Sequence, residues 1–216
     1  MAIVNEASLE AALKIVYCGA PLAGKSTNLH SVHSQLPEAE RGDLVAVSNS
    51  TDQIHFFDFH PSDGIDLHGY RLSFQLYTVP GRVTYNATRQ LVLREVDGIV
   101  FVVDSQPERF NENIAALDQM AASLSHNGID PRKIPIVAQY NKQDLPSPLT
   151  PHRLEEAFQT ILGTQPLVTL EANAAQGFNV FETLNASAVE VLNRFKPPTP
   201  GAPQKRSVKG RAALSS

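Results

Sequence analysis

Cysteine is almost absent from this sequence, and Cys18 is the only one among 216 residues. An internal disulfide is therefore excluded, and we expect the protein to work in a reducing compartment such as the cytoplasm. Long apolar runs are also missing, since none approaches the roughly 18–20 residues that cross a bilayer. The first four residues lack the basic and apolar regions of a secretory signal. These absences predict a cytoplasmic protein without an integral membrane segment.

Positive charge is scarce over most of the chain. The formal net charge is −4, from 18 basic and 22 acidic side chains. Four of the basic residues lie in the last twenty positions, which hold no acid, so the preceding chain has 14 basic against 22 acidic side chains, a net of −8. This balance argues against a general nucleic-acid binder.

The C-terminal end differs in composition from the rest of the chain. Residues 197–203 are rich in proline, and they are followed by Lys205, Arg206, Lys209 and Arg211. This composition predicts one domain over residues 1–196 and a disordered, Pro-rich basic tail over 197–216. Such a tail is either a solvated extension or a docking segment for an acidic partner or an anionic lipid surface. Four charges are few for the second role.

Apolar segments of strand and helix character alternate along the domain, which predicts an α/β fold with a mostly parallel central sheet flanked by helices. Residues 54–59 and 70–77 are expected to form an antiparallel pair joined by a turn at 61–64. Ligands of such sheets bind at the carboxyl ends of the strands. The predicted strands are 13–18, 44–47, 54–59, 70–77, 98–104, 133–140 and 166–170, and the predicted helices are 27–36, 114–124, 150–162 and 181–191.

A phosphate-binding loop follows the first predicted strand. Residues 19–26 read Gly-Ala-Pro-Leu-Ala-Gly-Lys-Ser, which fits the P-loop pattern G-x-x-x-x-G-K-[ST]. Glycines let the backbone N–H groups turn toward an anion, the lysine adds positive charge, and the serine hydroxyl is suited to Mg²⁺. The predicted phosphate contacts are Gly19, Ala23, Gly24, Lys25, Ser26, Thr27 and, from a later segment, Gly81.

A base-selecting segment follows the strand predicted at 133–140. Residues 141–144 read Asn-Lys-Gln-Asp, and a carboxylate there can accept both N1–H and N2–H of guanine, a pair of donors that adenine does not offer. Asn141 is expected to brace the loops, and the stem of Lys142 to cover the ring. We therefore predict GTP or GDP as the ligand. The predicted guanine contacts are Asn141, Lys142, Asp144, Ala172 through its backbone N–H, and Asn173.

Together these motifs resemble MglA, the family of small GTPases of bacterial cell polarity and gliding motility. The resemblance covers about residues 10–195, and Thr78-Val79-Pro80-Gly81 is its most specific element, because other Ras-like proteins have aspartate in place of this threonine. The segments that carry it are 19–29, 56–59, 76–81, 96–98, 104–106 and 139–142.

The resemblance implies a P-loop NTPase with a Ras-like G domain that binds GTP/GDP and Mg²⁺. It also implies inactivation by an MglB-like roadblock-domain GTPase-activating protein, together with effector proteins that the sequence does not identify. A nucleotide-dependent switch in polarity or motility is the corresponding function.

Three positions depart from the family where the chemistry takes place. The water-orienting glutamine after Gly81 is replaced by Arg82, and the arginine and threonine of the first switch are replaced by Gln53 and Ile54. Gln53 and Arg82 are the candidate catalytic residues, with their two roles exchanged. Asp52 remains available as a metal ligand beside Ser26.

These departures leave two functions open. The first is a switch enzyme with slow or partner-dependent GTP hydrolysis, and the second is a pseudo-GTPase that binds nucleotide as a scaffold or adaptor without significant hydrolysis. A P-loop kinase or ATPase is disfavoured by the segment at 141–144.

Two further features are expected to be structural. His55, His60 and His68 lie close in the sequence, but strand alternation separates their side chains and disfavours a metal site. Cys18 is expected to be a small buried residue beneath the phosphate loop.

Overall fold

The computed structural model describes residues 2–49, 52–62, 64–80 and 86–197. Its strands are β1 (Ile3–Asn5), β2 (Glu10–Gly19), β3 (Val45–Asn49), β4 (Asp52–Phe59), β5 (Ile65–Leu67), β6 (Tyr70–Thr78), β7 (Gly98–Asp104), β8 (Ile136–Asn141) and β9 (Val168–Glu171). Its α-helices are α1 (Lys25–Gln35), α2 (Asn86–Val92), α3 (Phe110–His126), α4 (His152–Leu162) and α5 (Val180–Arg194), with 3-10 turns η1 (Glu38–Glu40) and η3 (Pro107–Arg109).

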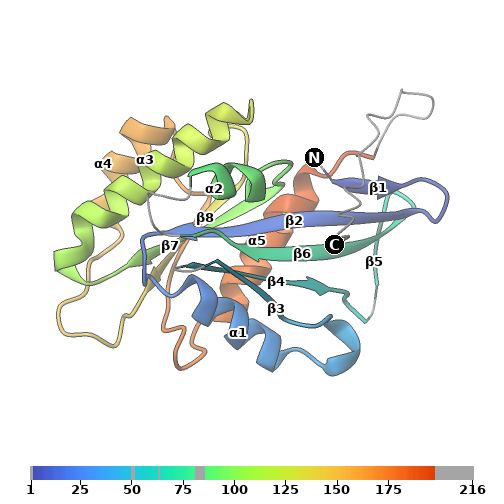
Figure 1. Ribbon diagram of the computed structural model, residues 1–216, viewed down its shortest axis with the longest axis horizontal. Helices are drawn as coiled ribbons and strands as arrows, with labels where there is room; N and C mark the ends of the chain where they lie inside the picture. The colour runs from blue at the N-terminus through green and yellow to red at the C-terminus, as the bar shows by residue number, and fades with distance from the viewer. Residues whose placement is uncertain (1, 50–51, 63, 81–85, 198–216) are drawn as a thin grey trace, which may run out of the picture.

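One mostly parallel sheet organises the domain, with the strand order β3-β4-β6-β2-β7-β8-β9. The short strand β1 pairs with β2, and β5 pairs with β6. Strands β6, β2, β7, β8 and β9 run parallel, so their carboxyl ends meet at one edge. Figure 1 shows α2 and α3 on one side of the sheet and α1 on the other. This is the fold class that the sequence predicts.

The centre of the sheet is apolar on both faces. Every residue of β7 and of β8 is buried, as the continuous apolar run at 98–104 predicts. Gly98 lets α5 approach this strand closely, because a Cβ at that position would lie 2.3 Å from Cγ2 of Val191. The central strands are therefore closely packed by the helices, and the loops of the site extend from their ends.

The antiparallel pair expected from residues 54–59 and 70–77 is confirmed. Phe56 of β4 lies opposite Tyr77 of β6, and Phe59 lies opposite Phe74. The connection is longer than the predicted turn, because β5 adds a second short pairing with the start of β6. Three residues are too few to show the alternation from which a strand is recognised, and β1 was missed for the same reason.

The start of β8 also differs from the prediction. The strand begins at Ile136 rather than at residue 133. A turn precedes it, in which the N–H of Lys133 donates to the carbonyl of Asp130 at 3.0 Å, and Pro135 has no N–H for the ladder. The expected elements are otherwise present, with α2 as an additional helix.

Candidate nucleotide-binding site

The phosphate loop lies at the edge where the parallel strands end. It leaves β2 at Gly19 and enters α1 at Lys25, at the left of the view in Figure 1. Gly19 and Gly24 have φ angles of 138° and 102°. A Cβ would lie 2.1 Å from the Val102 carbonyl oxygen at Gly19, and 2.2 Å from Asn141 Nδ2 at Gly24. Both glycines are thus required by backbone conformation and by close neighbours.

The side chain of Lys25 folds back onto the backbone of the phosphate loop. Its ammonium donates to the carbonyl oxygens of Gly19 at 3.0 Å and Ala20 at 2.7 Å, and the residue is 8% exposed. Ser26 and Thr27 follow in the first turn of α1, half-buried and exposed respectively. The positive charge and the N-terminus of an 11-residue helix therefore lie together, an arrangement suited to an anion such as a nucleotide phosphate.

Asn141 connects the two halves of the site. Its side-chain nitrogen donates to the Ala23 carbonyl at 2.8 Å, and its side-chain oxygen accepts from the Ala174 N–H at 2.8 Å. The residue is 3% exposed. The link between loops that the sequence predicts for Asn141 is thus present, and it joins the phosphate loop to the segment after β9.

Lys142 and Asp144 diverge from the same turn. Lys142 has a positive φ of 69°, and its ammonium lies 2.6 Å from Oδ2 of Asp104, a residue with no solvent exposure. Asp144 is exposed. The stem of Lys142 therefore has a fixed end, while the Asp144 carboxylate is open to a ligand.

The Ala172 N–H, which is predicted to contact guanine, takes part in a backbone hydrogen bond. This N–H continues the pairing of β9 with β8 and donates to the Tyr140 carbonyl at 2.8 Å. The N–H of Asn173 donates to the Phe178 carbonyl at 3.1 Å. Neither group points into an open site, so a guanine contact through Ala172 would require its ladder hydrogen bond to be replaced. The carbonyl of Ala172 accepts from the Gln143 N–H at 3.1 Å, which holds this segment beside the base-selecting turn.

Thr78 ends β6 at the position where other Ras-like proteins have aspartate. Its hydroxyl accepts from the His55 N–H at 2.9 Å and lies 3.4 Å from the His55 carbonyl oxygen. Thr78 is 1% exposed. Because the backbone register of β4 and β6 begins at Phe56 and Tyr77, the threonine side chain supplies the next link between these strands.

Only one of the two catalytic candidates lies within the described part of the chain. Gln53 is exposed on β4, opposite Ser48 of β3, and Ile54 is half-buried beside it. Arg82 and Gly81 lie outside the described residues, as does the side chain of Asp52. The exchange of roles between Gln53 and Arg82 therefore stays a prediction.

The histidines do not assemble into a metal centre. Among the described residues no cluster of three or more His, Cys, Asp or Glu side chains is suited to hold a metal ion. His55 is buried against His30 of α1, with ring centroids 5.1 Å apart, whereas His60 and His68 are exposed. Burial, and secondarily His30, lowers the pKa of His55 from its ordinary value.

Sequence reasoning missed two arginines that contact the loops of the site. Arg109 donates to the Pro21 carbonyl of the phosphate loop at 2.7 Å. Arg89 of α2 is 4% exposed and donates to the Pro80 carbonyl at 3.3 Å. Both contacts join residues from different elements, so no local sequence pattern predicts them. The sequence did offer one signal for Arg109. Asp104 is an acidic residue at the end of a buried strand, and a buried carboxylate requires a cationic partner.

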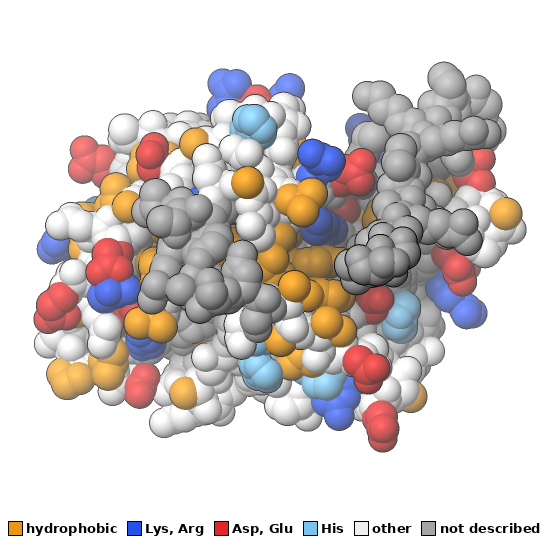
Figure 2. Space-filling model, in the orientation of Figure 1, with side chains coloured by type: hydrophobic (Ala, Val, Ile, Leu, Met, Phe, Trp, Pro, Cys, Tyr) orange, Lys and Arg blue, Asp and Glu red, His pale blue; other side chains and the backbone are white. Residues whose placement is uncertain are grey.

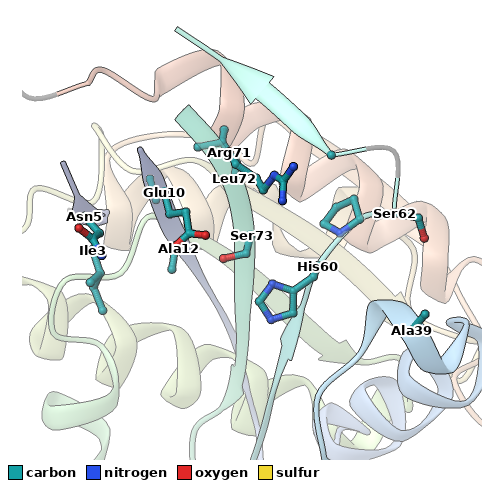
Figure 3. Close-up of a pocket in the computed structure, with 13 residues that line it drawn as sticks. Ile3, Asn5, Glu10, Ala12, Ala39, His60, Ser62, Arg71, Leu72 and Ser73 are labelled. Atoms are coloured by element: carbon teal, nitrogen blue, oxygen red, sulfur yellow. The ribbon is translucent and has the colours of Figure 1, made fainter. Parts of the chain in front are cut away.

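A separate hollow of about 580 Å³ lies at the opposite end of the sheet. Figure 3 shows Glu10, Arg71, Ser73 and His60 around it, from the starts of β2 and β6 and from the loop after β4. None of the predicted nucleotide contacts that the structure describes lines it. On the face shown in Figure 2, acidic and basic side chains of the described residues are interspersed.

Comparison with known proteins decides the family. The model of the ADP-ribosylation factor family matches residues 1–188. The chain belongs to this family of small GTPases. It is 41% identical over 196 residues to the mutual gliding-motility protein MglA of Myxococcus xanthus, covering 91% of this chain and 98% of that protein. The chain is therefore an MglA-like small GTPase, as the resemblance of its motifs indicates.

More distant relatives agree with this family. ADP-ribosylation factor-like protein 6 of Caenorhabditis elegans is 26% identical over 143 residues, which is 64% of each chain. The structure of the Arl6 BBS3 small GTPase of Trypanosoma brucei with the nucleotide analogue GppNp matches with a TM-score of 0.62 and 18% identity, covering 85% of this chain and 99% of that one. The latter similarity confirms the fold. Within the described residues no helix combines the length and the apolar character needed to cross a membrane.

Proposed function

We propose that this MglA-like small GTPase is a GTP-binding molecular switch whose hydrolysis is slow or depends on a partner. The observation that carries the proposal is the double hydrogen bond of Asn141, which joins the phosphate loop to the segment after β9. Asp144, the predicted base-selecting residue, is exposed three residues further along the same turn, and this supports the proposal.

Mg²⁺ would suit the oxygen donors that the sequence offers at this site. The Ser26 hydroxyl stands in the first turn of α1, directly after Lys25, and Asp52 at the start of β4 is the second candidate ligand. A hydroxyl and a carboxylate, completed by phosphate oxygens and water, form the ligand set that magnesium prefers. The ion would neutralise charge on the phosphates, while Lys25 and the helix N-terminus bind them.

The cellular role that we propose follows from the relative. The Myxococcus protein is named for mutual gliding motility, and 41% identity over nearly the full length of both chains supports a related task in polarity or motility. An MglB-like roadblock-domain activator is the corresponding partner, together with effectors that recognise the switch segments. A cytoplasmic location with partner-dependent visits to a pole is consistent with this role.

A pseudo-GTPase without significant hydrolysis is the second candidate. Gln53, Ile54 and Arg82 favour it, because none of them is the residue that the family uses at that position. The two candidates differ in single-turnover hydrolysis of GTP, alone and with a roadblock-domain protein. Turnover that the partner accelerates supports the switch enzyme, and GTP that stays intact in both conditions supports the binding module.

The guanine assignment is tested by Asp144→Asn. The amide loses the ability to accept two N–H groups of guanine, and we expect the affinity for GDP to fall by about 10²–10³-fold, the effect of losing a charged bidentate pair. Xanthosine diphosphate, which offers one N–H and one carbonyl, should bind the variant better than GDP does. An unchanged affinity for GDP would contradict the assignment. Asp130→Asn, far from the site on a surface ion pair with Arg132, is the control.

A further inference from the structure

Asp104 ends β7 with its carboxylate fully buried. Its backbone is fixed by Asn113 of α3, whose side-chain oxygen accepts from the Asp104 N–H at 3.0 Å and whose nitrogen donates to the Asp104 carbonyl at 2.8 Å. A buried carboxylate requires cationic partners. Lys142 lies 2.6 Å from Oδ2, and Nε of Arg109 lies 3.7 Å from the same oxygen.

Arg109 reaches from this carboxylate to the phosphate loop. The residue precedes α3, and its guanidinium contacts Asp104, Glu112 and the Pro21 carbonyl, the last at 2.7 Å. Pro21 is 88 residues away in the sequence. A planar guanidinium with five donors can hold such divergent partners together, whereas a lysine ammonium on a flexible stem cannot hold the same geometry.

The loop needs support at this position. Ala20 and Ala23 have no solvent exposure and are held by the core, but Leu22 between them is 83% exposed and has a positive φ of 62°. Pro21 has no N–H to donate. The Arg109 hydrogen bond therefore anchors the loop at Pro21, next to the exposed Leu22.

We propose that Arg109 is a positioning residue that couples the base-selecting turn to the phosphate loop through Asp104, and so slows the release of the bound nucleotide. The inference rests on the proposed guanine-nucleotide binding. One carboxylate oxygen fixes Lys142 on the base side and Arg109 on the phosphate side, so the two loops are held at a constant separation. Arg109 contacts the backbone of the loop, so the role assigned to it is positioning rather than chemistry.

The test measures dissociation of a fluorescent GDP and a fluorescent GTP analogue from the full chain. Arg109→Ala is expected to release both about tenfold faster, the change that follows from losing a charge-assisted hydrogen bond. Arg109→Lys should release the nucleotides almost as fast as Arg109→Ala, because the contact depends on the planar guanidinium and not on the charge alone. Arg132→Ala is the matched control, since Arg132 forms an exposed ion pair with Asp130 remote from both loops.

Coupling is tested by combining Arg109→Ala with Lys142→Ala. If both act through Asp104, the double variant should release GDP less rapidly than the product of the two single effects predicts. Independent, multiplicative effects would overturn the coupling, and an Arg109→Ala dissociation rate within about twofold of the unaltered protein would overturn the positioning role. Failure of the unaltered protein to bind GDP would instead overturn the proposed function. Circular dichroism identifies any variant that does not fold, and Arg109→Gln then replaces Arg109→Ala.

Discussion

Gly24 lies so close to the Asn141 side chain that no larger residue fits at position 24. A Cβ on Gly24 would lie 2.2 Å from Nδ2 of Asn141, and this nitrogen is already committed to the Ala23 carbonyl at 2.8 Å. The end of the asparagine side chain therefore cannot move aside without losing hydrogen bonds. The glycine of the phosphate loop and the first residue of the base-selecting segment thus depend on each other.

Gly24→Ala is expected to weaken GDP binding by about 10–100-fold, because relief of the close contact costs the hydrogen bonds of Asn141, about 1 kcal/mol each. Isothermal titration with GDP measures the change. Gly128→Ala is the matched control, since Gly128 also has a positive φ, 72°, but has no atom within 4 Å of the added Cβ. The control should lose about 1–2 kcal/mol of stability and keep its affinity. Equal affinity for both variants would show that the Asn141 contact is unimportant.

Thr78→Val tests the link between β4 and β6. Valine preserves the shape of threonine but leaves the buried His55 N–H without its acceptor, so the free energy of unfolding should fall by about 1–3 kcal/mol. Urea denaturation measures it. Thr169→Val, on an exposed position of β9, is the control and should change stability little. A Thr78 variant as stable as the parent would mean that the hydroxyl contributes nothing to joining the two strands.

His55 predicts a pH dependence of stability. Burial lowers its pKa below the ordinary 6.5, so the unfolded chain binds a proton in a pH range where the folded chain does not. The free energy of unfolding should therefore fall as the pH drops from 6.5 toward the lowered value, with a slope of up to about 1.4 kcal/mol per pH unit from this group. Urea titrations at several pH values compare the parent with His55→Phe. The variant should show a shallower decline, and parallel curves would contradict this assignment.

Cys18 is expected to be chemically inert in the folded protein. Burial raises the pKa of its thiol to about 12, although Lys25 and Arg89 oppose the shift. Since the thiolate is the reactive form, a thiol-specific reagent at pH 8 should label the chain only when urea unfolds it. Rapid labelling of the native protein would show that the region beneath the phosphate loop opens.

The parts of the site that were predictable are those in which adjacent residues carry the chemistry. The phosphate loop is encoded in eight consecutive residues, and its glycines have the conformations that the pattern requires. The buried strand before Asn141 places the base-selecting turn at the same edge. The central strands were predictable because their apolar runs are continuous.

The rest depends on contacts between distant residues. The Arg109–Pro21 hydrogen bond joins positions 88 residues apart, and the pairing that occupies the Ala172 N–H is set by the register of β9 against β8. β1 and β5 form because a neighbouring strand offers hydrogen bonds, and three residues alone show no periodicity. The side-chain link from Thr78 to His55 likewise appears only when β4 lies beside β6.

The most direct test of the central claim is the nucleotide that the purified protein binds. Mass analysis of the released ligand, followed by titration with GDP, GTP and ATP in the presence of Mg²⁺, gives its identity and its selectivity. We predict a guanine nucleotide and a preference for GDP and GTP over ATP that Asp144→Asn removes. An adenine nucleotide in the site, or equal affinity for GTP and ATP, would contradict the account.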